Sequence, residues 1–182
     1  MIANRSLQIS LFVEGFHDKL FVKRILEPRL LWKYEAVQIH QYASIPDQTL
    51  LSHFRSLKRM PSTHFFILAD YDEGPCISAR RQDILQRFLS LLQSSQILIV
   101  RCEIESWYLA GVPEENPFGV SMPSMVETIN KQGFRSLFAT WCKRRRTDYA
   151  SLMSEILTIY DWNLALQRSP SLEYCARRLG IL

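Results

Sequence analysis

Short apolar segments alternate with amphipathic ones over the first hundred residues, and this alternation constrains the fold more than any other feature of the chain. The apolar segments are the runs expected of buried strands, and the segments between them carry apolar residues at helical spacing. Strands are expected over Leu7–Val13, Ala36–Tyr42, His64–Ala69 and Gln96–Arg101, and helices over Asp18–Leu31, Pro46–Met60 and Ser78–Ser94. Alternation of this kind predicts an α/β fold with a parallel sheet and helices on both faces.

The pattern changes after Arg101. A short helix is expected over Cys102–Ala110, a loop rich in glycine and proline over 111–124, and amphipathic helices from Met125 onward. We therefore expect an α/β core over residues 1–110 and a helical C-terminal extension over 111–182 that packs on the core.

Composition limits the location and the metal chemistry of the chain. A hydrophobic content of 47% in 182 residues supports a well-buried core. No apolar run approaches the ~20 residues that span a bilayer, and the first residues lack a signal-peptide pattern, so we expect a cytoplasmic protein without membrane contact. The four cysteines are far apart and the four histidines are scattered, which predicts reduced, half-buried thiols and disfavours a zinc site.

Acidic residues follow two of the expected strands. Asp70 and Asp72 follow the third strand, and Glu14 follows the first. Residues two apart in extended chain point to the same face, and parallel strands bring their carboxyl ends to one edge of the sheet. Carboxylate oxygens are ligands for Mg²⁺ or Mn²⁺, so the sequence predicts a site for one of these cations. The alternative for Asp70 and Asp72 alone is an acidic loop that ends a strand.

Asp18 has two compatible interpretations. It stands where the first helix is expected to begin, so it is a candidate N-cap residue, and it is also a candidate metal ligand near Glu14. Gly15 suits a tight turn beside a bound metal or phosphate.

These residues resemble a known domain. Val13-Glu14-Gly15 with Asp18, followed by Ala69-Asp70-Tyr71-Asp72 after an apolar strand, is similar to the Toprim domain of topoisomerases, bacterial primases, recombination mediators and OLD-family nucleases. The resemblance covers roughly the first hundred residues. It implies a Rossmann-like parallel sheet in which the glutamate and the Asp-x-Asp pair bind Mg²⁺.

The second half resembles a narrower group, the small stand-alone Toprim proteins related to OLD nucleases in bacterial defence loci. The resemblance rests on the segment from Glu103 to Ala110, on Arg146-Thr147-Asp148-Tyr149-Ala150 and on Ser169-Pro170-Ser171-Leu172. It implies that Glu105 is a further metal ligand. The alternative for Glu105 is a surface acid on a helix that buries Trp107 and Leu109. Where the group commonly has a catalytic lysine this chain has Arg146, with Lys143 three residues earlier.

Positive charge is concentrated near the C-terminus. Residues 131–182 hold 9 Lys and Arg against 4 Asp and Glu, whereas residues 1–130 hold 13 against 14. The run Lys143, Arg144, Arg145 and Arg146 is therefore a candidate site for the phosphate backbone of DNA or RNA. The alternative is a solvated face of a helix. The neighbouring aromatic residues Phe134, Phe138 and Trp141 are assigned to the core.

The function expected from these features is a divalent-metal-dependent nuclease, with Glu14, Asp70, Asp72 and Arg146 as catalytic residues and an anti-phage defence role implied by the resemblance. One alternative is a non-catalytic Toprim-fold docking protein in a DNA-repair or defence assembly. A haloacid-dehalogenase-type phosphohydrolase is disfavoured, because its Asp-x-Asp follows the first strand rather than the third. The partners considered are nucleic acid, an ATPase encoded nearby and a second copy of the chain.

Overall fold

The computed structural model describes residues 7–71, 75–89 and 91–182, so Asp72 lies outside the described part. Contacts between residues divide the chain into two compact units. Of the described residues, the first unit comprises 7–69, 75–89, 91–99 and Ile181, and the second comprises 70–71, 100–180 and Leu182. The division predicted at residue 110 stays a prediction.

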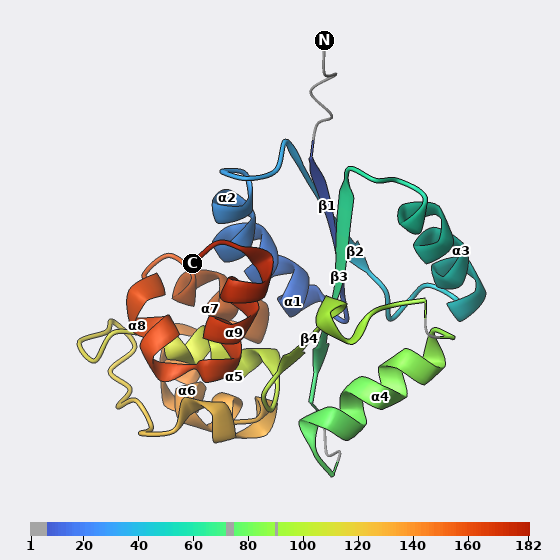
Figure 1. Cartoon of the computed structure of the whole chain (residues 1–182). Coiled ribbons are helices and arrows are strands. Elements are labelled where there is room, and N and C mark those ends of the chain that lie inside the picture. The colour runs from blue at the N-terminus through green and yellow to red at the C-terminus, as the bar shows by residue number, and fades with distance from the viewer. Residues whose placement is uncertain (1–6, 72–74, 90) are drawn as a thin grey trace. The chain divides into compact units, whose positions relative to one another are not determined.

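The first unit is built on a four-stranded parallel sheet (Figure 1). Its strands are β1 (Gln8–Val13), β2 (Ala36–Gln41), β3 (Thr63–Asp70) and β4 (Ile97–Val100), in the order β2-β1-β3-β4. The predicted α/β class, with a Rossmann-like parallel sheet flanked by helices, is confirmed. The chain runs from β1 to β2 and then returns to the other side of β1 for β3. The boundary between β1 and β3 is therefore the point where the strand order switches direction, and ligands of such sheets bind beyond the strand ends at that point.

Helices cover both faces of this sheet. They are α1 (Phe16–Phe21), the π-helical turn η1 (Val22–Leu26), α2 (Glu27–Leu30), α3 (Asp47–Lys58), α4 (Ile77–Arg87) and the short 3₁₀ turn η2 (Ser94–Gln96). In Figure 1, α1 and α2 lie on one face, and α3 and α4 lie on the other.

The predicted start of the first helix and the predicted end of the helix after β3 are wrong. The first helix begins at Phe16 rather than Asp18, because Gly15 takes the extended N-cap conformation. The helix that follows β3 ends at Arg87 rather than Ser94. Leu89 adopts a left-handed conformation with φ of 50°, which a continuing right-handed helix cannot accommodate.

An aromatic cluster fixes α3 and α4 to the sheet. The fully buried ring of Phe54 packs edge-on against Phe12 of β1 at 4.8 Å and against Phe88 at 5.2 Å. The same ring stacks on Phe65 of β3, with the centroids 5.8 Å apart. Because Phe54 contacts both β1 and β3, the cluster supports the two strands whose ends carry the predicted acidic residues.

The second unit is helical and buries many of its apolar side chains. It contains α5 (Ile104–Ala110), the 3₁₀ turn η3 (Val126–Thr128), α6 (Lys131–Arg145), α7 (Tyr149–Ile156), α8 (Trp162–Arg168) and α9 (Pro170–Leu179). Every residue of α5 is buried, which explains its lack of an amphipathic pattern. The core assignment of Phe134, Phe138 and Trp141 is confirmed, since each is at most 3% exposed.

The helices α6 to α9 begin at residues whose side chains accept a backbone N–H, and these are Asn130, Asp148, Asp161 and Ser169. No helix among the described residues is long and apolar enough to cross a membrane. The four cysteines are free thiols, as predicted. Cys102 and Cys142 are half-buried, whereas Cys76 is exposed and Cys175 is buried.

Candidate active site

Glu14 is the first residue after β1 and is held by two neighbours in the first unit. The Tyr42 hydroxyl donates to Glu14 Oε2 over 3.5 Å, and Arg80 Nη2 lies 4.0 Å from the same oxygen. Burial, and then the charge of Glu14, raises the pKa of the Tyr42 hydroxyl, so this group keeps its proton and acts as a donor. The Glu14 side chain remains 37% exposed, which leaves the carboxylate accessible to a ligand.

Asp18 does not serve as the N-cap of the first helix. It lies in the first turn of α1, is 4% exposed, and accepts the Gly15 N–H through Oδ2 over 3.0 Å. A Cβ atom added to Gly15 would lie 3.1 Å from that oxygen, so glycine permits this close approach. The N-cap interpretation is therefore wrong in position, although Asp18 still binds the backbone at the helix start. The hydrogen bond from Gly15 holds the Asp18 carboxylate in place four residues after Glu14 in the sequence.

Asp70 is the last residue of β3 and belongs to the second unit. The next residue, Tyr71, donates its N–H to the carbonyl of Val100, the last residue of β4, over 2.9 Å. The register of β1 and β3 pairs Val13 with Leu68. Thus Glu14 directly follows β1, and Asp70 ends β3, the parallel strand that pairs with β1.

Several carboxylates of the second unit act on the thiol of Cys102. Burial, and then the negative charge of Glu103, raises the pKa of Cys102, and the charges of Asp70 and Glu105 raise it further. Cys102 also has a φ of 70°, a left-handed conformation that is uncommon for a residue with a side chain. Negative charge therefore accumulates around a strained turn directly after β4.

Glu105 is buried, with an exposure of 3%, so its interpretation as a surface acid is wrong. It stands in the first turn of α5, where Tyr149 donates its hydroxyl hydrogen to Oε1 over 2.6 Å. Burial, and then this hydrogen bond, raises the pKa of Tyr149 and keeps the hydroxyl protonated. The Arg135 guanidinium lies 4.7 Å from the Tyr149 ring centroid. The Tyr149 hydroxyl thus holds the Glu105 carboxylate in one orientation.

A polar hollow of about 400 Å³ lies at the start of α6 in the second unit. Its lining combines one carboxylate with two cations and two amides, and consists of Glu103, Asn130, Lys131, Gln132 and Arg135. Glu103 accepts the backbone N–H of Lys131 through Oε2. The carboxylate of Glu103 therefore caps α6 from one side of the hollow.

The basic run spans the end of α6 and the turn after it. Lys143, Arg144 and Arg145 occupy the last helical turn, where cations interact favourably with the helix dipole. Arg146 follows in the left-handed conformation, with φ of 54°, and all four side chains are exposed. Arg146 therefore lies outside the helix that carries the other three residues. Arg144 also lines a hollow of about 430 Å³ with Thr140, Trp141 and residues of the loop before α6.

The residues predicted as metal ligands are carboxylates, and carboxylate oxygens are the ligands that hard cations such as Mg²⁺ prefer. Among the described residues, no three or more Asp, Glu, His or Cys side chains form a group able to hold a metal ion. Asp72, the second acid of the predicted pair, lies outside the described residues. The described residues thus do not form a metal site by themselves, and the predicted ligands stay a prediction.

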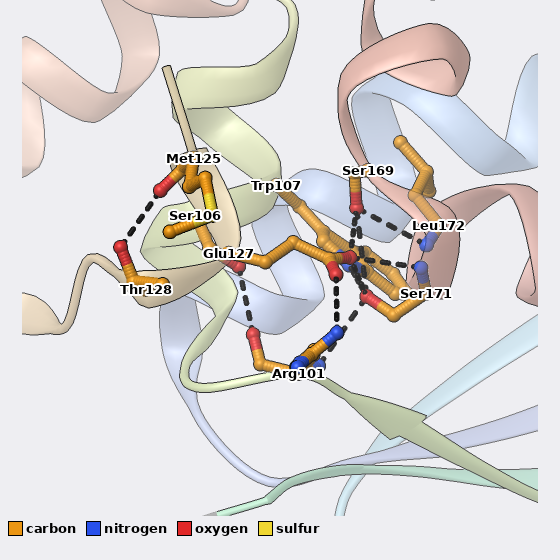
Figure 2. A network of polar contacts seen from close by, with 9 residues as sticks. All are labelled: Arg101, Ser106, Trp107, Met125, Glu127, Thr128, Ser169, Ser171 and Leu172. Atoms are coloured by element: carbon orange, nitrogen blue, oxygen red, sulfur yellow. Dashed lines mark hydrogen bonds and ion pairs between the residues drawn. The ribbon is translucent and has the colours of Figure 1, made fainter. Parts of the chain in front are cut away.

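The sequence patterns did not predict the buried carboxylate of Glu127. It is 8% exposed, and its Oε1 accepts bonds from the hydroxyls of Ser169 and Ser171 (Figure 2). The segment from Ser169 to Leu172 was singled out by the family resemblance, but no pattern around residue 127 marks that glutamate. Its partners lie 42 and 44 residues further along the chain, so only the fold identifies them.

Comparison with known proteins gives one structural similarity. No protein-family model matches the chain, and no curated protein matches it. The C-terminal region of the Xanthomonas campestris pv. campestris OLD protein is similar in structure, with a TM-score of 0.42 and 14% sequence identity. The similarity covers 95% of this chain and 90% of that one. A similarity this low carries no argument about function, so the functional assignment depends on the residues of this chain.

Proposed function

We propose that this chain is a divalent-metal-dependent nuclease of the Toprim type that hydrolyses phosphodiester bonds of DNA or RNA. One observation supports the proposal above the others. The parallel strands β1 and β3 are neighbours at the switch point of the sheet, and Glu14 and Asp70 stand at their carboxyl ends. This is the position where α/β sheets bind their ligands, and both residues carry the chemistry of Mg²⁺ or Mn²⁺ ligands.

The proposed metal ligands are Glu14, Asp70 and Asp72, with Asp18 and Glu105 as further ligands. A bound Mg²⁺ or Mn²⁺ supplies a water of lowered pKa as nucleophile and neutralises charge on the phosphate. Three of these carboxylates have a hydrogen-bond donor in their own unit. Tyr42 donates to Glu14, the Gly15 amide to Asp18, and Tyr149 to Glu105. Carboxylates oriented in advance lose little conformational freedom when a ligand binds.

Nucleic acid is proposed to contact the basic run Lys143–Arg146, with Arg146 as the candidate catalytic cation. All four side chains are exposed, and the left-handed turn at Arg146 separates it from the helical end. Exposed cations bind phosphates without reading sequence, which suits a nuclease of broad specificity. A role in bacterial defence, with an ATPase partner or a second copy of the chain, belongs to the same proposal.

The test combines cleavage with metal binding. Purified protein is incubated with plasmid, single-stranded DNA and RNA in Mg²⁺ or Mn²⁺, with and without EDTA. Glu14→Gln and Asp70→Asn are each expected to lower the cleavage rate by at least about 100-fold, because each removes a charged ligand. Both should also reduce the rise in melting temperature that Mn²⁺ causes. Glu155→Gln, which changes an exposed acid of α7, is the matched control and should leave both properties unchanged.

The contrary outcomes are specific. Cleavage that persists in EDTA, or in both acidic variants, contradicts the metal mechanism. If the wild-type protein binds nucleic acid but cleaves none, the non-catalytic docking role becomes the better proposal.

The basic run has its own test. Arg144→Gln combined with Arg146→Gln is expected to reduce the salt dependence of duplex DNA binding by about 0.9 in log–log slope for each lost phosphate contact. The double variant Arg177→Gln and Arg178→Gln removes the same charge from α9 and serves as the control. If the salt dependence of DNA binding has the same slope in both double variants, the basic run is a solvated helix end that does not contact DNA.

A further inference from the structure

The buried carboxylate of Glu127 is held by hydrogen bonds from the start of α9. Oε1 accepts the Ser169 hydroxyl at 2.7 Å, the Ser171 hydroxyl at 2.5 Å and the Ser171 backbone N–H at 2.8 Å (Figure 2). Three donors on one oxygen fix the orientation of the carboxylate. Glu127 is therefore a buried carboxylate held in one orientation inside the second unit.

The same network fixes the backbone of Arg101. Its N–H donates to the Ser171 hydroxyl oxygen over 3.3 Å, and its carbonyl accepts the Ser106 hydroxyl over 3.1 Å. The Trp107 indole N–H donates to the Ser171 hydroxyl over 2.8 Å, so that hydroxyl is itself held in place. Arg101 thus has a backbone bonded on both sides, directly before the left-handed residue Cys102.

The guanidinium of Arg101 is not enclosed by this network. Its side chain is 62% exposed, and Nη1 lies 3.9 Å from Glu127 Oε2, the oxygen opposite the one that binds the serines. A guanidinium has five N–H donors, and a contact of this length leaves donors available to an anion. The carboxylate of Glu127 attracts one side of the group, while its exposed side can meet a ligand.

Within the second unit, one backbone hydrogen bond links the residue before Arg101 to the residue after Asp70, a proposed metal ligand. Arg101 follows Val100, whose carbonyl accepts the N–H of Tyr71, and Tyr71 follows Asp70. The ends of β3 and β4 are thus joined by a hydrogen bond within the second unit. Arg101 follows the end of β4 and Asp70 ends the neighbouring strand β3, and α/β sheets bind their ligands beyond such strand ends.

We propose that Arg101 binds the scissile phosphate and stabilises the charge that develops on it, and that Glu127 is a positioning residue for Arg101. This inference rests on the nuclease activity proposed above. In the hydrolysis the water oxygen forms a bond to phosphorus as the ester P–O bond breaks. The water loses one proton to solvent, and the leaving oxygen gains one. Arg101 gives up no proton, and it contributes charge and planar donors matched to two phosphate oxygens.

A purely structural role for Arg101 makes different predictions. If its guanidinium only neutralises Glu127, then replacing it lowers stability and leaves the cleavage rate of the folded protein unchanged. Cleavage must therefore be measured below the melting temperature of each variant, with the folded fraction determined by circular dichroism.

The test compares Arg101→Gln, Arg101→Lys and Arg101→Ala with Arg177→Gln, which removes an exposed arginine of α9. Under single-turnover conditions, Arg101→Gln is expected to cleave about 100-fold more slowly, the loss typical when one transition-state donor is removed. Arg101→Lys should be intermediate, because it keeps the charge without the planar fork. Added guanidinium ion, at concentrations that do not unfold the protein, should partly restore Arg101→Ala. Arg177→Gln should cleave at the wild-type rate.

Glu127→Gln tests the positioning role, because it keeps an acceptor oxygen for the serines and removes the charge. We expect a smaller loss of rate than in Arg101→Gln, and no additional loss when the two changes are combined. The Mn²⁺-dependent rise in melting temperature should be the same in all these variants and in wild type. Rates within a factor of about three of wild type in both Arg101→Gln and Arg101→Ala overturn the inference, since a transition-state donor is worth far more.

Nucleic-acid binding separates this inference from the proposed function. If the wild-type protein does not cleave, the nuclease proposal fails, and the phosphate contact is tested with a fluorescent DNA duplex. Arg101→Gln should then reduce the salt dependence of binding by about 0.9 in slope, whereas Arg177→Gln should not. Equal slopes in these two variants, or no binding by wild type, overturn the phosphate contact.

Discussion

Replacing Gly111 by alanine would place a methyl group where the ring of Tyr160 already lies. Gly111 is the C-cap residue of α5, and a Cβ atom there would be 2.5 Å from both Cδ2 and Cζ of Tyr160 and closer still to Cε2. The φ of Gly111 is −91°, which alanine adopts without strain. The cost of the substitution therefore arises from the clash with the ring.

The expected loss in free energy of unfolding has two parts, the overpacking and the interaction that the Tyr160 ring loses when it moves. Overpacking a well-packed interior typically costs about 1–3 kcal/mol. The Tyr160 hydroxyl donates to the Trp107 carbonyl over 2.9 Å, and displacement of the ring would lose a hydrogen bond worth about 1 kcal/mol. The expected loss in free energy of unfolding is about 2–4 kcal/mol, a large part of the ~5–15 kcal/mol of a typical domain.

Urea denaturation followed by tryptophan fluorescence measures this loss, with two other glycines as controls. At Gly119 an added Cβ meets nothing within 4 Å but the φ is +64°, so alanine should cost about 1 kcal/mol of backbone strain. At Gly133, in α6, the nearest atoms are 3.4 Å away and alanine should stabilise the helix by up to about 1 kcal/mol.

From most to least stable, the expected order is Gly133→Ala, wild type, Gly119→Ala and Gly111→Ala. Adding Gly111→Ala to Tyr160→Ala should cost almost nothing further, because the obstructing ring is gone. The reasoning is refuted if Gly111→Ala unfolds within about 0.5 kcal/mol of wild type, the range of an ordinary surface substitution.

Three further predictions concern pH, capping and a surface ion pair. Burial lowers the pKa of His40 below the value of 6.5 for the unfolded chain. Stability should therefore fall as the pH drops below that value, and fall less in His40→Gln; equal urea midpoint shifts would contradict this. Ser169→Ala removes the N-cap of α9 and a donor to Glu127, and should cost about 1–2 kcal/mol, whereas an unchanged melting temperature would exclude a capping role. Asp47→Asn breaks an exposed pair with Arg87, and should cost less than about 1 kcal/mol at low salt and almost nothing at high salt; a loss independent of salt would show another cause.

The sheet of the first unit was largely predictable from local patterns. The four strands follow from short apolar runs, and their alternation with helical segments required a parallel arrangement. Glu14 and Asp70 could be named as acids at strand ends because a strand end is a local property of the sequence. The strand order was not predictable in the same way, since it depends on which strands pair across distant parts of the chain.

Local errors had local physical causes. Gly15 rather than Asp18 is the N-cap of the first helix, because Gly15 takes the extended conformation and its N–H donates to the Asp18 side chain three residues later. The helix before β4 is shorter than its apolar pattern, because the positive φ of Leu89 ends it. Apolar periodicity does not record where a backbone leaves the helical region.

The sequence by itself determined the class of fold, the ends of strands that carry acids and the exposed basic run, because each depends on residues close together in the chain. Only the tertiary structure decided that Glu105 is buried against Tyr149, 44 residues away, and that Glu127 binds two serines at the start of α9 while facing Arg101. A glutamate has the same local pattern whether it is solvated or buried. What distinguishes the two is whether distant segments supply enough donors to replace the water that burial removes, and the packing of the helices settles that.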